Sequence, residues 1–313
     1  MAKLRRVIQK GRIVIAGGSG FIGSALAKDF SQNGHEVVVL TRHPQQRLDG
    51  VREILWDGVH IGEWIREFEG AQAIINLTGK SINCPHTPEN LHEIHQTRMN
   101  SVYAFAAAIR QVKVRPSVWV QASAVGYYGD TGDKLCEETA PPGQSDLAKI
   151  CVDWEGLTNA ANRPLIRKVA LRLGFVLGRD GGALPVLATL TRMFLGGAAG
   201  SGKQYISWIH IADVVRMVAE VISNEAYSEA YNAVAPNPVT NAEFMQELRR
   251  ALHRPWSPPV PEFAVKFGTR LMRGESSLAL TSHRCFPKRF ADAGFKFLYP
   301  ELGPAFKELC AKA

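Results

Sequence analysis

Gly17-Gly18-Ser19-Gly20-Phe21-Ile22-Gly23 joins the apolar run 13–15 to an amphipathic run that continues to residue 27. This order predicts a strand, a tight turn and the start of a helix. The glycines at positions 18, 20 and 23 have the spacing of the dinucleotide fingerprint, in which the helix N-terminus binds a pyrophosphate. A glycine turn of an ordinary α/β protein is the simpler interpretation. A second apolar run at 36–40 completes a βαβ unit and favours the nucleotide site.

The length of 313 residues exceeds the usual size of one domain, so we expect a large α/β domain with a smaller appendage. No apolar run approaches the roughly 18 residues of a membrane span. No signal-peptide core follows the start, so we expect a cytoplasmic protein without a membrane partner. The cysteines are far apart and form no Cys-x-x-Cys pair, which predicts reduced thiols and no metal site: Cys84, Cys136, Cys151, Cys285 and Cys310.

The basic residues behind the net charge of +8 gather in two groups. The first is a basic leader at 1–10, and the second consists of Arg270, Arg273, Arg284, Lys288 and Arg289. A solvated surface is the simpler interpretation of both, and the second group could instead line a site for an anionic ligand. No helix-turn-helix, zinc-finger or RNP-like signature accompanies them, so no nucleic-acid partner is expected.

The end of the second predicted strand indicates which dinucleotide the chain prefers. NAD-binding sites usually place an acid there for the ribose hydroxyls, whereas an arginine suits the 2′-phosphate of NADP. Here Thr41 and Arg42 follow the strand, and no acid occurs between Glu36 and Asp49. The pattern therefore favours NADP, with a surface arginine as the simpler alternative.

Further strands are predicted at 53–57, 73–79, 117–123 and 168–174, with a long helix at 88–111. Asp57 could face the adenine or merely open a turn. The run 117–123 ends at Ser123 and is followed by Tyr127 and Tyr128 in a glycine-rich turn. Hydroxyl groups at the carboxyl end of a strand suit chemistry. Tyrosines in such a turn are also ordinary packing residues.

Beyond residue 178 glycine pairs break the pattern, which predicts a second lobe. We expect the cofactor domain to comprise 11–178 plus 208–236, and the smaller C-terminal substrate lobe to comprise 179–207 plus 237–313. The run from Trp208 is expected to begin a helix, with Asp213 as a cap or first-turn acid. The stretch 229–234 should return a strand to the main sheet, and Thr240 should open a capping box.

Together the motifs GGSGFIG, INLTG, SAVGYYGD, LRLGFVLG and WIHIADVV, in this order, resemble those of the extended short-chain dehydrogenase/reductases, which include nucleotide-sugar epimerases and dehydratases. More narrowly, the chain is similar to the atypical, YfcH-type epimerase-like subgroup over residues 11–310. The resemblance implies a doubly wound parallel sheet, that is, a Rossmann fold, with NADP as the cofactor.

The resemblance also implies roles for single residues. Thr41 and Arg42 would bind the adenosine phosphate, and Ser123 matches the catalytic hydroxyl. Lys149 matches the lysine of the family's Tyr-x-x-x-Lys motif, which holds the nicotinamide ribose. The remaining implied cofactor-binding positions run from the glycine turn to the later strands: Gly17, Ser19, Gly20, Phe21, Ile22, Gly23, Leu77, Thr78, Glu93, Arg98 and Val176.

One departure from the family pattern affects the chemistry. Ser145 stands where the motif has its tyrosine, and no Tyr-x-x-x-Lys occurs in the sequence. Either Tyr127 or Tyr128 must then supply the missing phenol if the chain is a catalyst.

Two functions follow as expectations. The first is an NADP-dependent oxidoreductase or epimerase acting on a small carbonyl or hydroxyl compound or a nucleotide sugar, with an anionic substrate as one alternative. The second is a catalytically impaired, NADP-sensing interaction protein, because some relatives carry a cell-division-inhibitor label. A monomer and a homodimer both remain open.

The first prediction concerns cofactor choice. NADPH should bind at least tenfold more tightly than NADH, a difference of about 1.4 kcal/mol. The substitution Arg42→Ala should remove most of this difference, because the 2′-phosphate loses its cationic partner. Fluorescence titration of both cofactors measures it, and equal affinities in the unmodified protein would contradict the argument.

Overall fold

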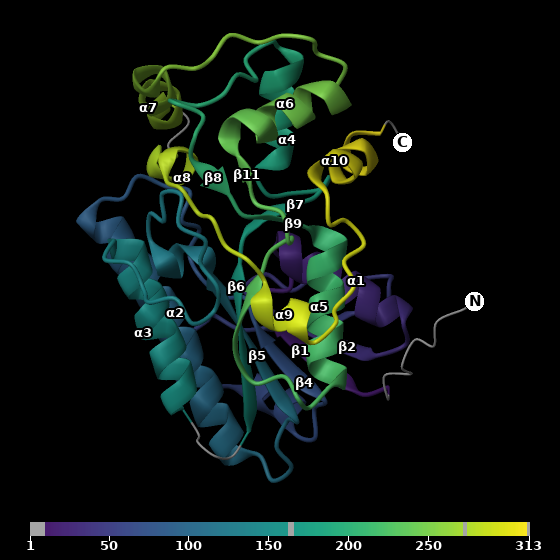
Figure 1. Ribbon diagram of the computed structural model, residues 1–313. Coiled ribbons are helices and arrows are strands. Elements are labelled where there is room, and N and C mark those ends of the chain that lie inside the picture. Colours follow the sequence, from purple (N-terminus) through teal and green to yellow (C-terminus); the bar gives the residue numbers. More distant parts are fainter. Residues whose placement is uncertain (1–9, 162–165, 272–273, 312–313) are drawn as a thin grey trace.

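The computed structural model describes residues 10–161, 166–271 and 274–311 (Figure 1). Most of the basic leader and Arg273 therefore lie outside the described residues. At the centre is a parallel sheet of seven strands in the order β10-β6-β5-β4-β1-β2-β3. Its strands are β1 Arg12–Ala16, β2 Glu36–Thr41, β3 Arg52–Leu55, β4 Ala73–Asn76, β5 Val118–Ala124, β6 Arg167–Leu173 and β10 Glu229–Ala233. This topology confirms the predicted doubly wound α/β fold.

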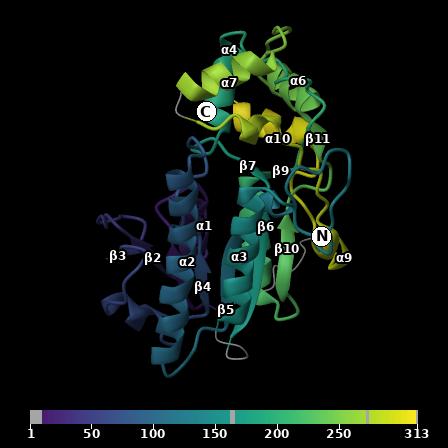
Figure 2. The same cartoon turned by 90° about the vertical axis from the view of Figure 1, so that its left-hand side faces the viewer.

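Helices cover both faces of the sheet, with β3 and β10 at opposite edges (Figure 2). On one face lie α1 (Phe21–Gln32) and α5 (Ile211–Ser223), and on the other α2 (Pro88–Gln111) and α3 (Asp146–Ala160). Successive residues of a strand point to opposite faces. Ile13 accordingly packs in the core cluster under α1 and α5, whereas Val14 packs in the cluster under α2. Burial on both faces explains why the strands read as continuous apolar runs.

A second, smaller lobe sits beyond the carboxyl ends of the strands, at the top of Figure 1. Its helices are α4 (Leu184–Arg192), α6 (Asn241–Ala251), α7 (Glu262–Leu271), α8 (Ser277–Leu280) and α10 (Leu302–Cys310). Two strand pairs lead into it, β7 (Phe175–Leu177) with β9 (Trp208–His210), and β8 (Tyr205–Ile206) with β11 (Val239–Thr240). Phe244 and Phe306 are fully buried in its core. Within the described ranges, none of the helices combines the length and apolar character that crossing a membrane requires.

Two sequence expectations differ from the structure. The run from Trp208 begins as strand β9 rather than as a helix, because it pairs with β7, and α5 starts only at Ile211. The segment after residue 286 returns to the main domain. Its short helix α9 (Lys288–Asp292) contacts β10, and Phe290 is fully buried in the core of the sheet. The predicted strand β10 and the Thr240–Glu243 capping box are confirmed.

Asp213 fastens the C-terminal segment to the main domain. His210 caps α5, while the Asp213 carboxylate is fully buried and reaches to the chain beyond α9. It accepts hydrogen bonds from the backbone N–H groups of Leu298 (2.7 Å) and Tyr299 (2.9 Å). Asp213 is therefore a connection between distant segments rather than a cap of its own helix.

The substitution Asp213→Ala should lower the free energy of unfolding by about 2–4 kcal/mol, because two backbone N–H groups lose their acceptor. Asp213→Asn, which keeps one carbonyl oxygen, should cost less. Urea unfolding measures both, with the exposed Asp153→Ala as the matched control. Equal midpoints for Asp213→Ala and the control would contradict this account.

Candidate functional site

The turn between β1 and α1 leaves an open helix N-terminus. Gly20 precedes α1 and supplies no side-chain cap, and no acid occupies the first turn. The first N–H groups of a helix have no partner within the helix, so they are available to an anion. A Cβ atom on Gly23 would lie 2.4 Å from the Gly17 carbonyl oxygen, which is why the helix can approach this turn only with glycine at that position. The turn thus has the shape that a pyrophosphate requires.

The predicted adenosine-phosphate residues lie beside this turn. Thr41 Oγ1 donates a hydrogen bond to Ser19 Oγ (3.3 Å), so the end of β2 meets the glycine turn. Arg42 follows directly and is exposed. Among the residues that the structure describes, no carboxylate pairs with Arg42. Asp57 instead accepts hydrogen bonds from the backbone of its own turn and from His60, which lower its pKa to about 2, so it opens a turn.

The residues that follow β4 lie beside the glycine turn at the carboxyl ends of the strands. Leu77 N donates to the Ala16 carbonyl (3.0 Å), and the Leu77 backbone lies next to Gly17. Thr78 Oγ1 is buried and has no hydrogen-bond partner within the described residues. A buried hydroxyl without a partner is costly, so a polar ligand group at this edge would satisfy it.

Phe21 and Val176 pack between the glycine turn and the residues that follow β7. The Phe21 ring packs against Gly178, Gly181 and Gly182, where added Cβ atoms would lie 2.5–3.1 Å from it. Val176, on β7, is buried in the core next to this ring. The half-buried Ile22 packs against the same core. The structure thus brings these predicted positions together with the glycine turn.

Glu93 and Arg98 lie farther along, on α2. Glu93 is exposed and forms an ion pair with Lys80. The Arg98 guanidinium donates to the carbonyls of Lys80 (3.0 Å) and Ile94 (2.9 Å) and lies 4.9 Å from the Trp154 ring centre. Burial lowers its pKa. These contacts give both residues a structural role in the loop after β4.

Ser123 lies near the carboxyl end of β5 and belongs to a buried polar network. Its hydroxyl donates to Glu155 Oε1 on α3 (2.5 Å). The same carboxylate accepts two hydrogen bonds from Arg172 on β6, 2.9 Å from Nε and 2.8 Å from the terminal nitrogen. All three side chains are less than a tenth exposed. A two-point ion pair of this geometry holds the carboxylate rigidly.

The hydroxyl groups of Tyr127 and Tyr128 differ in their hydrogen bonds. The Tyr128 hydroxyl donates to Asn232 Oδ1 (2.8 Å) and accepts from Arg172 (2.8 Å), and burial raises its pKa. Tyr127 is half-buried, with its ring 3.5 Å from the Arg172 guanidinium. Its hydroxyl has no hydrogen-bond partner in the part of the chain that the structure describes. Of the two phenols, only that of Tyr127 can therefore serve a substrate without breaking the network.

Lys149 does not reach Ser123. Its side chain is 64% exposed and lies 3.7 Å from Asp146 on the outer side of α3, and Ser145 caps that helix. The side facing Ser123 carries Glu155 and, one turn earlier, Cys151, whose thiol bonds the Ala124 backbone and whose pKa burial raises to about 11. Lys149 precedes Cys151 by two residues and so points about 200° away. Matching the motif by spacing missed this orientation.

Three members of the second basic group make contacts within the chain, and Arg273 lies outside the described residues. Lys288 pairs with Asp292, and Arg289 pairs with Glu229 (2.9 Å). Arg284 lies 4.6 Å from the Tyr205 ring centre and donates to a backbone carbonyl. These contacts stabilise the fold locally.

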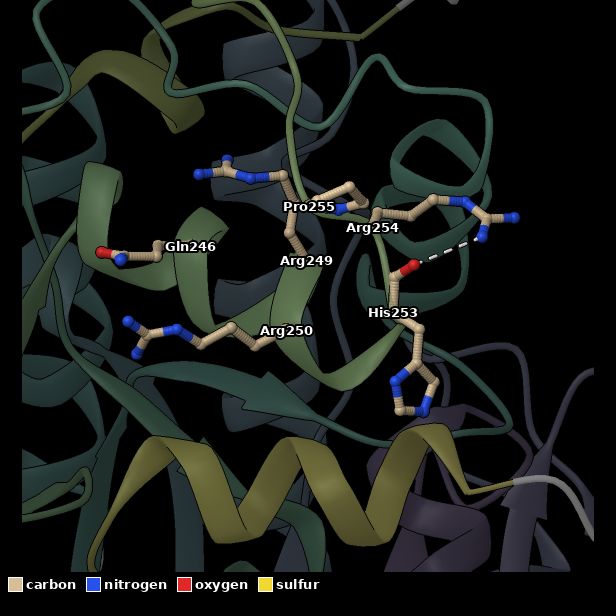
Figure 3. Close-up of a pocket in the computed structure, with 6 residues that line it drawn as sticks. All are labelled: Gln246, Arg249, Arg250, His253, Arg254 and Pro255. Carbon is tan, nitrogen blue, oxygen red and sulfur yellow. Dashed lines mark hydrogen bonds between the residues drawn. The ribbon is translucent and has the colours of Figure 1, made fainter.

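A hollow of about 390 Å³ beside α6 is lined by the basic residues Arg249, Arg250, His253 and Arg254, together with Gln246 and Pro255. Figure 3 shows the side chains of Arg250 and Arg254 extending to opposite sides. Arg249 and Arg254 each donate to a backbone carbonyl of the α4 region, at 2.8 and 3.2 Å. Arg249 and Arg254 therefore connect α6 and the residues after it to the α4 region, and the arginine side chains do not point toward one common anion.

Residues 13–233 match the model of the NAD dependent epimerase/dehydratase family, which covers more than half of the chain. The chain belongs to this family. Residues 260–309 match a second model, described as a domain of unknown function, DUF1731. The family agrees with the predicted extended short-chain dehydrogenase/reductase resemblance.

Similar proteins share nearly the whole length. The Arabidopsis thaliana protein "Epimerase family protein SDR39U1 homolog, chloroplastic" is 34% identical over 95% of this chain and 86% of its own length. Bacillus subtilis YfhF, also an epimerase family protein, is 32% identical over 96% and 98%. The crystal structure of human epimerase family protein SDR39U1 (isoform2) with NADPH superimposes with a TM-score of 0.85 at 31% identity, covering 96% of this chain and 99% of that one. The chain is an epimerase-family protein of the SDR39U1 type.

The buried ion pair yields the next prediction. Glu155→Gln should reduce the free energy of unfolding by about 3–5 kcal/mol, because Arg172 stays buried without its opposite charge. Urea unfolding measures it, and Glu93→Gln, which removes a carboxylate from an exposed pair, should change little. Similar small losses in both variants would contradict the assigned importance of the pair.

Proposed function

We propose that this chain binds NADP and acts as an NADP-dependent oxidoreductase or epimerase on a small carbonyl or hydroxyl compound or a nucleotide sugar. The observation that carries the proposal is the open N-terminus of α1 beside Ser19, Thr41 and the unpaired Arg42. Backbone N–H groups there suit a pyrophosphate, and an arginine at the end of β2 suits a 2′-phosphate.

The residues present fit this cofactor. Gly23 lets α1 lie directly against the glycine turn, and Thr78 offers a buried hydroxyl that lacks a partner within the described residues. The related human protein was crystallised with NADPH, which supports the assignment. When bound, the cofactor supplies or accepts a hydride at its nicotinamide.

The chain's own residues handle the substrate oxygen. Because the Ser123 proton is given to Glu155, the Ser123 oxygen is free to accept a hydrogen bond from a substrate hydroxyl. Arg172 fixes the orientation of Glu155 and lies against the Tyr127 ring, so one cation positions both groups. Tyr127 then exchanges a proton with the substrate oxygen as the general acid or base.

This assignment replaces the family's motif with groups from other elements. Tyr128 is engaged in the network, and Lys149 points away from Ser123, so neither takes the roles expected from the motif. The cation beside the active tyrosine is Arg172 instead.

The test incubates the purified protein with NADPH and a panel of carbonyl compounds and nucleotide sugars while the absorbance of the reduced nicotinamide is followed. Oxidation of NADPH should be slow and should fall by a further factor of about 10² to 10⁴ in Tyr127→Phe, because this variant loses the positioned proton donor. It should also fall in Ser123→Ala, because the hydroxyl that forms on the substrate loses its hydrogen-bond acceptor. NADPH affinity should stay unchanged in both. Epimerisation that leaves the nicotinamide absorbance constant is followed by chromatography of the nucleotide sugars.

Tyr103→Phe, which alters an exposed tyrosine on α2, is the control. Brisk turnover that persists in Tyr127→Phe/Tyr128→Phe would overturn the assigned proton donor. Intact NADPH binding without any turnover would favour the NADP-sensing role over the enzyme.

A further inference from the structure

A short loop covers the cofactor turn from the side of the second lobe. Residues 178–182, called the glycine loop here, follow β7 and enclose the ring of Phe21. Added Cβ atoms at Gly178 and Gly181 would lie 2.5–2.6 Å from ring atoms, so the contact is close. Phe21 is also the first residue of α1, and its backbone belongs to the helix N-terminus. The placement of the glycine loop therefore determines how α1 begins.

The C-terminal helix α10 holds this loop. Arg179, within the glycine loop, lies 3.2 Å from the Glu308 carboxylate and also donates to the Glu308 carbonyl. The second carboxylate oxygen of Glu308 lies 3.1 Å from His210 Nε2. His210 caps α5 and stacks on the Tyr299 ring at 3.9 Å. One carboxylate thus connects the glycine loop to the start of α5.

Glu308 is itself held in place by packing. Phe306, two residues earlier on α10, is fully buried against Phe244, with the ring centres 5.0 Å apart. The chain that leads into α10 is fastened by the two hydrogen bonds to Asp213. Because α10 is anchored at both points, Glu308 presents a fixed acceptor to Arg179.

We propose that Glu308 is a positioning residue for the cofactor site: α10 holds the glycine loop against Phe21, so that the first N–H groups of α1 are aligned for the pyrophosphate. The inference rests on the proposed NADP site. It gives a role to part of the segment 260–309, which matches a domain of unknown function. The adenosine end of the site, at Thr41 and Arg42, does not contact the glycine loop and stays independent of it.

The experiment compares two ligands, NADPH and adenosine 2′-monophosphate. The second fills the adenosine end but carries no 5′-phosphate for the N-terminus of α1. Glu308→Gln should weaken NADPH binding about threefold, the effect of a half-exposed ion pair, and leave the affinity for adenosine 2′-monophosphate unchanged. Arg179→Gln loses the carbonyl contact as well and should weaken NADPH binding roughly tenfold, again without a change for adenosine 2′-monophosphate.

Glu247→Gln is the matched control, because it breaks the Glu247–Arg250 ion pair of α6, which does not touch the glycine loop. It should leave both affinities unchanged. Unfolding temperatures of all variants are measured in parallel, so that a general loss of stability is recognised by an equal effect on both ligands.

The outcomes separate the two proposals. Equal weakening of both ligands, or no change in Glu308→Gln, would overturn the positioning role and leave the NADP site standing. Tighter NADPH binding in Glu308→Gln would also overturn it, because Arg179 would then be a phosphate ligand that Glu308 withholds. Failure of the unmodified protein to bind NADPH would overturn the proposed function and this inference with it.

Discussion

The arrangement of the site depends on the buried ion pair between Arg172 and Glu155. Arg172 lies on β6 and Glu155 on α3, and their contacts extend to β5 through Ser123 and to β10 through Tyr128 and Asn232. Burial by itself lowers the pKa of Arg172, but the hydrogen bonds and charge of Glu155 outweigh it and raise that pKa. Arg172 therefore keeps its positive charge.

Such a pair is not the cheapest way to fill a core. Removing two charges from water costs several kcal/mol per ion, and apolar residues of the same volume often stabilise a protein equally well. The ion pair instead fixes the orientation of the side chains around it. Arg172 makes hydrogen bonds to Glu155 and Tyr128 and stacks on Tyr127, so a carboxylate of α3 and two phenols of the turn after β5 take fixed orientations around one guanidinium. A purely apolar core could not orient the Ser123 hydroxyl.

Local patterns in the sequence were sufficient for the βαβ unit, for α2 with its bounds at residues 88 and 111, and for the capping box at Thr240, because each depends on neighbouring residues. The residues of β9 were predicted to begin a helix, because a run of three residues is too short to show a period and only its pairing with β7 makes it a strand. Glu155 was missed as a partner of Ser123 because the two are 32 residues apart. The sequence did offer one signal of this pair, because Arg172 is a charged residue within an apolar run and therefore needs a buried partner.

The placement of the second lobe also follows from contacts that no local pattern in the sequence predicts. The segment 281–286 crosses from the second lobe to the main domain and is bonded along its length. Thr131 donates hydrogen bonds from its backbone N–H and its hydroxyl to the Ser282 carbonyl. The Ser207 hydroxyl bridges the His283 carbonyl and the Cys285 N–H, both at 2.8 Å. Together with Asp213, these contacts fix the second lobe on the carboxyl ends of the strands.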